Sequence, residues 1–286
     1  MGVRLLDTTV RSILTRTHGY LTDVCSHSLQ PYRGCSFGNA LCGVSCYVQH
    51  NGLLTRGERW GSFLEARRNA AEAYAAQVGR ERRFAHGRGR VFGVFLSSVT
   101  DPFVPQERKE GVTARVLDAM IEDPPDALVV QTHAPDVVRA RDRLRALSER
   151  CDVRVHVSIE SDRDTLPGLP PPAASVTRRF EAIATLRAAG LRTVVTVAPL
   201  LPMLDPHAFF GQVARVADAV VIDHFIGGDG SPDGSRTART ALPDAMEAVL
   251  PGSSSLAYRD RIVAIAREVL PGRVGVGREG FAGRYA

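Results

Sequence analysis

The stretch PYRGCSFGNALCGVSCYVQ (residues 31–49) carries three of the five cysteines of the chain, Cys35, Cys42 and Cys46. Thiolates favour zinc or iron–sulfur centres, but three of them are an incomplete set for a structural zinc site. A zinc ion would take its fourth ligand from one of four residues: Cys25, His18, His27 or His50. A [4Fe-4S] cluster on three cysteines would instead leave one iron open to a substrate or cofactor. The spacing, with six and then three intervening residues, leaves zinc, an iron–sulfur cluster and unligated buried thiols all open.

The composition is that of an ordinary globular protein, with 44% hydrophobic and 23% charged residues among 286. No apolar run reaches the length of a membrane span and the first residues lack a signal-peptide core, so we expect a cytoplasmic protein without membrane contact. The odd cysteine count, clustered at one end of a long chain, favours metal or redox chemistry over disulfides. The net charge of +5 is compatible with a phosphorylated or nucleic-acid partner, although no basic run forms a stripe.

After residue 60 the chain alternates between short β-branched runs and segments with helical periodicity. The expected buried strands are residues 91–98, 127–132, 153–159, 191–198 and 219–223. Val176, Phe180, Ile183 and Leu186 share one helical face, with Ser175 placed to cap the start and Gly190 to close the end. Val137, Ala140, Leu144 and Leu147 repeat this pattern one unit earlier. With a first strand ahead of residue 60, the series predicts six strand–helix units in a parallel sheet, either doubly wound or curled into a barrel.

Polar residues stand at the end of nearly every expected strand. The residues at these strand ends, polar and apolar together, are Ser97 to Asp101, Thr132 and His133, Ser158 to Glu160, Ala198 and Pro199, and Asp223 with His224. In parallel sheets and barrels the carboxyl ends of the strands carry the chemistry, because the connecting loops begin there. We therefore expect these residues to meet at one site.

The cysteine stretch resembles the cluster loop of the spore photoproduct lyase-like branch of radical S-adenosylmethionine (SAM) enzymes, which reads Pro-Tyr-x-Gly-Cys followed by two further cysteines and an aromatic residue. Other segments resemble this branch in the same order: SSVTDPFVPQERKEGVTARVL (97–117), VHVSIESD (155–162), RRFEAIATLRAAGLRTVVTVAPLLP (178–202) and VGVGREGF (274–281). The branch usually has three and then two residues between its cysteines, so SFGNAL predicts a wider loop here.

The resemblance implies an α/β fold, a partial (β/α)6 TIM-type barrel with parallel strands. We expect a single domain over residues 1–286, with a core at about 20–225 and a C-terminal lid and helix region at about 226–286. It also implies a [4Fe-4S] cluster and SAM as cofactors. The cluster would cleave SAM reductively to a 5′-deoxyadenosyl radical that abstracts hydrogen from a substrate, which is lyase-type or oxidoreductase-type chemistry.

Individual residues of this sequence match the cofactor-binding positions of the resembling branch. Cys35, Cys42 and Cys46 match the cluster ligands, and Tyr47 matches the aromatic residue beside the adenosyl moiety. The remaining expected SAM contacts are Thr100 and Asp101 for the methionyl and ribose groups, His133 in place of a lysine at the methionine carboxylate, Ser158 at the ribose with Glu160 on the same side of the strand, Ala198 at the adenine, and Arg178 (with Arg179) near the carboxylate. No catalytic residue is assigned.

Two departures concern hydrogen transfer. Ser98 stands where the lyases have a hydrogen-donating cysteine, and Ser45 stands where they have a tyrosine. We therefore expect a substrate other than spore photoproduct: a nucleotide or sugar metabolite, a natural-product intermediate, or nucleic acid. The expected partners include a reductant such as flavodoxin or ferredoxin, and the expected state is a monomer or weak dimer. The alternatives are a zinc-stapled nucleic-acid-binding protein and an iron–sulfur protein that does not cleave SAM.

Overall fold

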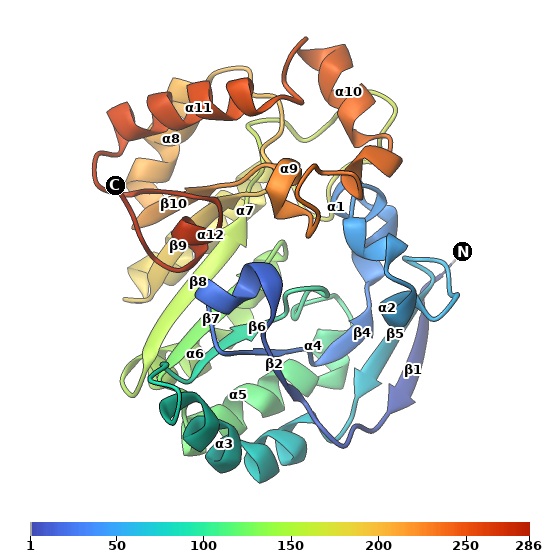
Figure 1. The fold of residues 1–286 in the computed structure, drawn as a ribbon, viewed down its shortest axis with the longest axis vertical. Helices are drawn as coiled ribbons and strands as arrows, with labels where there is room; N and C mark the ends of the chain where they lie inside the picture. Colours follow the sequence, from blue (N-terminus) through green and yellow to red (C-terminus); the bar gives the residue numbers. More distant parts are fainter. Residues whose placement is uncertain (1) are drawn as a thin grey trace.

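The computed structural model describes residues 2–286 and is built around an open sheet of eight strands (Figure 1). Their order is β11-β10-β9-β8-β7-β6-β3-β2, and all neighbours run parallel except β2 and β3. The strands are β2 (Leu14–Arg16), β3 (His27–Leu29), β6 (Gly93–Leu96), β7 (Ala127–Thr132), β8 (Asp152–Ser158), β9 (Arg192–Val197), β10 (Ala219–Ile222) and β11 (Val274–Val276). The six predicted parallel strands are β3 and β6 to β10, and the sheet does not close into a full barrel.

Helices connect successive strands and pack against one another around the sheet: α3 on α5, α5 on α6, α7 on α8, and α8 on α11. They are α3 (Ala70–His86), α5 (Val112–Glu122), α6 (Arg141–Ser148), α7 (Val176–Ala188), α8 (Pro206–Val216) and α11 (Leu256–Val269). Ser175 caps α7 as expected, because its hydroxyl accepts the N–H of Arg178 at 3.3 Å. The segment expected as one helix around Val137 is divided into the 3-10 helix η4 (Pro135–Ala140) and α6.

A second sheet, which the sequence pattern does not predict, lies beside the first and has the strand order β1-β5-β4. Its strands are β1 (Arg4–Thr8), β4 (Tyr32–Gly34) and β5 (Phe63–Arg67). The cysteine stretch leaves β4 and passes through four short helices before β5. These are η2 (Ser36–Asn39), α1 (Leu41–Val44), η3 (Tyr47–His50) and α2 (Gly52–Thr55). The second sheet therefore holds both ends of the cysteine-bearing segment.

The C-terminal segment returns to the main sheet. Its elements are α9 (Phe225–Gly228), η5 (Thr237–Arg239), α10 (Leu242–Val249), α11, β11 and α12 (Gly277–Phe281). β11 adds a parallel edge strand to β10, and the last residue pairs back with it, since the N–H of Ala286 donates to the carbonyl of Val274 at 3.0 Å. This return places α12 against β10 and against the 3-10 helix η1 (Gly19–Asp23).

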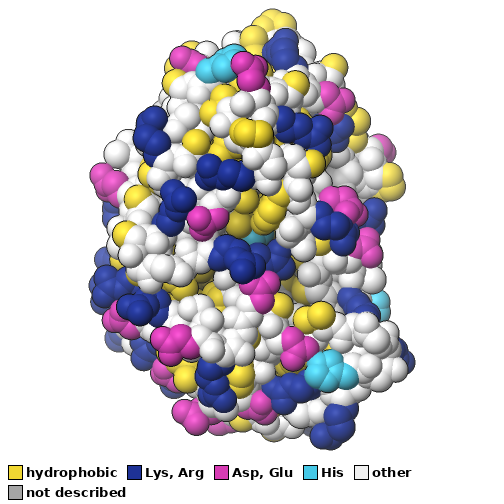
Figure 2. Space-filling model, turned by 90° about the vertical axis from the view of Figure 1, so that its left-hand side faces the viewer, with side chains coloured by type: hydrophobic (Ala, Val, Ile, Leu, Met, Phe, Trp, Pro, Cys, Tyr) yellow, Lys and Arg dark blue, Asp and Glu magenta, His cyan; other side chains and the backbone are white. Residues whose placement is uncertain are grey.

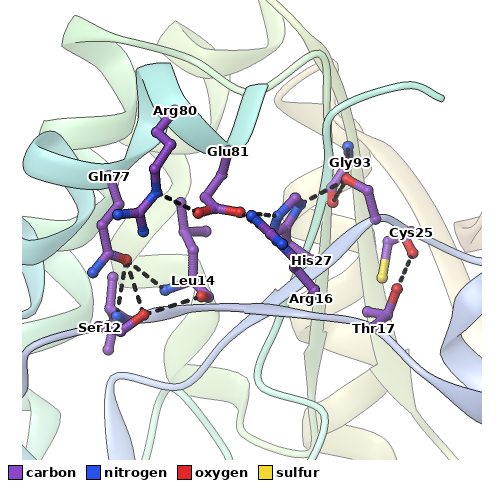
Figure 3. Close-up of polar contacts among 12 residues, drawn as sticks. Ser12, Leu14, Arg16, Thr17, Cys25, His27, Gln77, Arg80, Glu81 and Gly93 are labelled. Carbon is purple, nitrogen blue, oxygen red and sulfur yellow. Dashed lines mark hydrogen bonds and ion pairs between the residues drawn. The ribbon is translucent and has the colours of Figure 1, made fainter. Parts of the chain in front are cut away.

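A buried polar network joins the start of the main sheet to α3 (Figure 3). The carboxylate of Glu81 contacts Arg16 at 2.8 Å, Arg80 at 2.8 Å and the ring of His27 at 3.1 Å. Burial opposes ionisation of Glu81, but hydrogen bonds from these three residues outweigh it and lower its pKa to about 2. The side-chain oxygen of Gln77 accepts the N–H groups of Ile13 and Leu14. The network therefore fixes the β2–β3 hairpin on the helix.

No helix among residues 2–286 combines the length and the apolar character needed to cross a lipid bilayer.

Candidate functional site

A cavity of about 390 Å³ opens at the carboxyl ends of the main-sheet strands. The strand-end residues predicted to meet do meet there, with the exception of Thr132 and Ile159. The cavity is lined by Ser97, Ser98, Thr100 and Asp101 after β6, His133 after β7, Ser158 at the end of β8 and Glu160 after it, Ala198 and Pro199 after β9, and Asp223 and His224 after β10. This arrangement follows from the parallel sheet, which brings all carboxyl ends to one edge.

The three clustered cysteines line the same cavity. Cys35 directly precedes η2, Cys42 lies in α1, and Cys46 directly precedes η3. The six residues SFGNAL between Cys35 and Cys42 coil into η2 and the start of α1. This coil is tightly packed: a Cβ on Gly43 would lie 2.1 Å from the carbonyl oxygen of Phe37, and one on Gly38 would lie 2.2 Å from the Cα of Gly61.

Burial keeps these thiols neutral. It raises the pKa of Cys35 to about 12 and that of Cys46 to about 11, and the pKa of Cys42 is also raised well above its ordinary value. Binding of a metal centre would therefore release protons. Within residues 2–286 no three His, Cys, Asp or Glu side chains are arranged to hold a single metal ion. A cluster makes a different demand, because each cysteine binds its own iron.

Cys25 does not belong to this group. It packs beside Gly93, the first residue of β6, with its Cβ 3.6 Å from the position that a Gly93 Cβ would occupy. Its thiol contacts the carbonyl of Leu21 at 3.8 Å, within an apolar cluster that includes Phe95 and Val221. Gly93 is at the amino end of its strand, whereas the cavity is at the carboxyl end. Cys25 is therefore not placed to be the fourth ligand of a zinc ion bound by the other three cysteines. The alternative of a zinc site is left without the Cys25 thiol that was suggested as its fourth ligand.

A chain of alternating charges crosses one wall of the cavity. Arg179 donates to Glu160 at 2.6 Å and to the carbonyl of Ser158 at 2.7 Å, and Glu160 pairs with the ring of His133 at 2.9 Å. Burial disfavours both charges, but their attraction outweighs it. The pKa of Glu160 is lowered to about 2 and the pKa of His133 is raised. The pairing with Glu160 therefore favours the protonated form of the His133 ring.

Asp101 lines the cavity, but protein groups already occupy its carboxylate. It accepts hydrogen bonds from the hydroxyl of Thr132 at 2.8 Å, from the N–H of His133 at 2.7 Å and from the N–H of Phe103 at 2.9 Å. These bonds tie the loop after β6 to the end of β7. We therefore describe Asp101 as a residue that positions His133, whereas a direct contact with SAM stays a prediction.

The structure does not place Arg178 at the cavity, contrary to the prediction. Its side chain is exposed on α7 and does not line the cavity, whereas Arg179, one position later, is 3% exposed and does. One residue along an α-helix is a rotation of about 100°, since a turn holds 3.6 residues. Arg179 therefore takes the place that was predicted for Arg178.

Gln131 and Ser158 line the cavity and form hydrogen bonds below it with the buried Thr196. The side-chain nitrogen of Gln131 donates to Ser158 at 2.6 Å and to Thr196 at 2.9 Å. Gln131 was missed because it lies within a strand whose other residues are apolar or at its end. Ala198 lines the cavity next to a cis peptide bond to Pro199, and Tyr47 lines it beside Cys46. The positions of these residues agree with the predicted site, and their contacts with SAM stay predictions.

Two further aromatic residues line the cavity that were not predicted for the site. Tyr20 of η1 and Phe281 of α12 line the cavity, and their rings meet edge to face with centroids 6.2 Å apart. Ser97 has a positive φ of 69°, which is unusual for a residue other than glycine and is often found at functional sites. Only the tertiary structure brings Tyr20 and Phe281 to the site, whereas Ser97 is one of the predicted strand-end residues.

Several buried polar atoms of the cavity residues have no hydrogen-bond partner within the described part of the chain. They are Trp60 Nε1, Ser97 Oγ, Gln131 Oε1, Arg179 Nε and His224 Nε2. Unpaired buried polar atoms are costly, so a pocket that keeps several of them suits a polar ligand. The three neighbouring thiols fit an iron–sulfur cluster. The unpaired polar groups fit a polar cofactor such as SAM.

No protein-family model and no curated protein matches the chain. Solved structures of spore photoproduct lyase share its fold. A cysteine-to-alanine variant with dinucleoside spore photoproduct has a TM-score of 0.64 at 14% identity. A double variant with bound AdoMet and dinucleoside spore photoproduct has a TM-score of 0.61 at 13% identity. Both comparisons cover 96% of this chain and 81% of the lyase. At this identity the likeness shows the fold, including the partial TIM-type barrel.

Proposed function

We propose that this protein is a radical SAM enzyme. The observation that carries the proposal is the convergence of Cys35, Cys42 and Cys46 with the polar strand ends on one cavity, in a fold shared with spore photoproduct lyase. In this proposal the three cysteines bind a [4Fe-4S] cluster and the cavity binds SAM. When bound, the cluster supplies the electron that cleaves SAM reductively to methionine and a 5′-deoxyadenosyl radical, which takes a hydrogen atom from the substrate.

The residues around the cavity support this use. A cationic His133, held by Glu160 and Asp101, suits the carboxylate of a methionyl group. Ser158 and Gln131 offer hydroxyl and amide groups to a ribose. Apolar walls, among them Tyr47 and Phe281, would exclude water from the site.

The substrate is proposed to differ from spore photoproduct. Ser45 and Ser98 both line the cavity, so a hydroxyl replaces the tyrosine and the cysteine of the resembling branch at the site itself. A serine O–H bond is too strong to serve as a hydrogen-atom donor. A small molecule is favoured over nucleic acid, because Figure 2 shows acidic and basic side chains interspersed on one face of the molecule and no continuous basic surface there. A flavodoxin or ferredoxin in the cytoplasm would supply the electron.

Anaerobic reconstitution with iron and sulfide tests the proposal. With dithionite and SAM, we expect the wild-type protein to form 5′-deoxyadenosine, detected by mass spectrometry, and Cys42→Ala to lose at least 100-fold of this activity. Cys151→Ala is the matched control, because Cys151 directly precedes β8 at the amino end of the sheet and should keep full activity.

The two alternatives have different outcomes in this assay. A brown protein without 5′-deoxyadenosine would be an iron–sulfur protein that does not cleave SAM. A colourless protein that retains zinc after reconstitution would contradict the proposal and favour a zinc-stapled binding protein.

A further inference from the structure

Asp223 stands apart from the other carboxylates of the cavity, which are Asp101, Glu160 and Asp229. Asp101 is occupied by Thr132 and two backbone N–H groups, and Glu160 is paired with two cations. Asp229 is 2% exposed and accepts three hydrogen bonds, from the N–H and hydroxyl of Ser231 and from the N–H of Thr237. Asp223 accepts two hydrogen bonds and has no cation within 4 Å among residues 2–286.

The carboxylate of Asp223 is nevertheless held in a fixed orientation. Tyr20 donates its hydroxyl to one oxygen at 2.7 Å, and the N–H of His224 donates to the other at 2.9 Å. The backbone is fixed as well, because the N–H of Asp223 donates to Val197 and its carbonyl accepts from Leu200. The protein thus presents an oriented negative charge that it does not neutralise.

The space beside this carboxylate is kept open by a glycine. A Cβ on Gly228 would lie 2.6 Å from the Oδ2 atom of Asp223, and Gly228 itself lines the cavity. The backbone of Gly228 does not have a positive φ, so its conformation does not require a glycine. A glycine is required at this position because any side chain would collide with the Asp223 carboxylate.

Aromatic rings surround the same end of the cavity. Tyr20 contacts Asp223 through its hydroxyl and Phe281 through its ring, and Phe225 lines the cavity two residues after Asp223. A carboxylate close to aromatic rings can recognise ammonium groups, through charge and through cation–π attraction. The cations of the cavity, His133 and Arg179, are both engaged with Glu160 and do not serve Asp223.

From these contacts we propose that Asp223, Tyr20 and Phe281 form a subsite that binds an ammonium group of the substrate. This inference rests on the proposed function and names the class of its substrate, an amine. The ammonium group of SAM has the same chemistry, so the test distinguishes the two sources.

The test measures binding of benzylamine and of its uncharged counterpart benzyl alcohol to the reconstituted protein by titration calorimetry under anaerobic conditions. We expect saturable binding of benzylamine to the wild type, weakened at least tenfold in Asp223→Asn and in Gly228→Ala. Binding of benzyl alcohol should be weak and equal in all three proteins. Asp244→Asn, which removes an exposed carboxylate from α10, is the control for net charge and should bind benzylamine like the wild type.

Three results would overturn the subsite: no benzylamine binding to the wild type, equal binding in Asp223→Asn, or equal loss of benzyl alcohol binding. The second arm measures the KM for SAM in 5′-deoxyadenosine formation, which should be unchanged in Asp223→Asn. A KM raised tenfold would assign the carboxylate to SAM and also overturn the inference. Absence of 5′-deoxyadenosine from the wild type would contradict the proposed function alone, because benzylamine binding is measured independently of it.

Discussion

Two aspartates of one cavity show how the surroundings of a residue decide its protonation. Burial raises the pKa of Asp223 to about 6, only partly offset by the Tyr20 hydroxyl and the His224 N–H. Burial acts on Asp229 too, but hydrogen bonds from Ser231 and Thr237 outweigh it and lower its pKa. Arg259 of α11 is a charged group near Asp223, whereas the phenols of Tyr20 and Tyr47, which also lie near it, are neutral. A carboxylate that the fold leaves poorly satisfied reduces stability and favours a ligand.

This contrast predicts opposite effects of two Asp→Asn substitutions on stability. The folded state holds the Asp223 proton to higher pH than the unfolded state, so ionisation of Asp223 destabilises the fold as pH rises from about 4 through about 6. Asp223→Asn should therefore raise Tm, and by more at pH 8 than at pH 5. Asp229→Asn should lower Tm at pH 8, because its depressed pKa stabilises the folded state above the pKa of the unfolded chain. Thermal unfolding followed by circular dichroism at both pH values measures this, and a pH-independent Asp223→Asn effect would contradict it.

At the scale of the element, the cysteine loop (residues 35–46) coils into the short helices η2 and α1, which pack closely through Gly38 and Gly43. Gly43 meets Phe37 and Gly38 so closely that no side chain fits, whereas Gly52, at the start of α2, has nothing within 4 Å of its Cβ position. The loop also bonds to the opposite side of the cavity, since the N–H of Leu41 donates to the carbonyl of Pro171 at 3.0 Å. The spacing of the three thiols is therefore set by backbone packing.

Gly43→Ala should disrupt this loop without unfolding the protein. The added methyl group would displace η2 and α1 and cost about 1–3 kcal/mol of stability, as overpacking does. We expect at least a fivefold loss of iron bound after reconstitution, with the far-ultraviolet circular dichroism spectrum retained. Gly52→Ala, the same substitution in open space nine residues later, should bind iron like the wild type. Equal iron content in the two variants would show that the coil does not position the thiols.

At the scale of the whole molecule, buried polar contacts hold segments that are far apart in the sequence. Glu81 of α3 joins β2 and β3, with 3% of its surface exposed, while Glu58 pairs with Arg4 at the surface. Arg16 and Arg80 are about half exposed and would regain water if Glu81 were removed, but His27 is fully buried. The Glu81 network therefore contributes more to stability than the Glu58–Arg4 ion pair.

Glu81→Ala should lower the free energy of unfolding by about 2–3 kcal/mol, because it leaves Nε2 of the buried His27 ring without its partner while Nδ1 keeps Ser26. Glu58→Ala, which breaks an exposed ion pair, should cost less than about 1 kcal/mol. Urea unfolding monitored by the fluorescence of the single tryptophan, Trp60, measures both values. Equal losses in the two variants would mean that the network in Figure 3 adds nothing beyond a surface ion pair.

Local patterns in the sequence were enough to predict the repeating part of the fold. The apolar run 127–132 coincides with β7, and Ser175 and the apolar face from Val176 predict α7, because these signals depend on neighbours within a few residues. The meeting of polar strand ends also followed from the sequence, since parallel strands share one edge. The three clustered cysteines stood out by residue type and position, whereas their role as cluster ligands was inferred from the family resemblance and stays a prediction.

Contacts between distant segments were decided only by the tertiary structure. It selected Arg179 rather than Arg178, since the rotation of α7 about its axis depends on packing against the sheet. It excluded Cys25 by placing it at the opposite end of the strands, and it brought Tyr20 and Phe281 to Asp223. These residues are separated by up to 261 positions in the chain, and no local periodicity records which of them will meet.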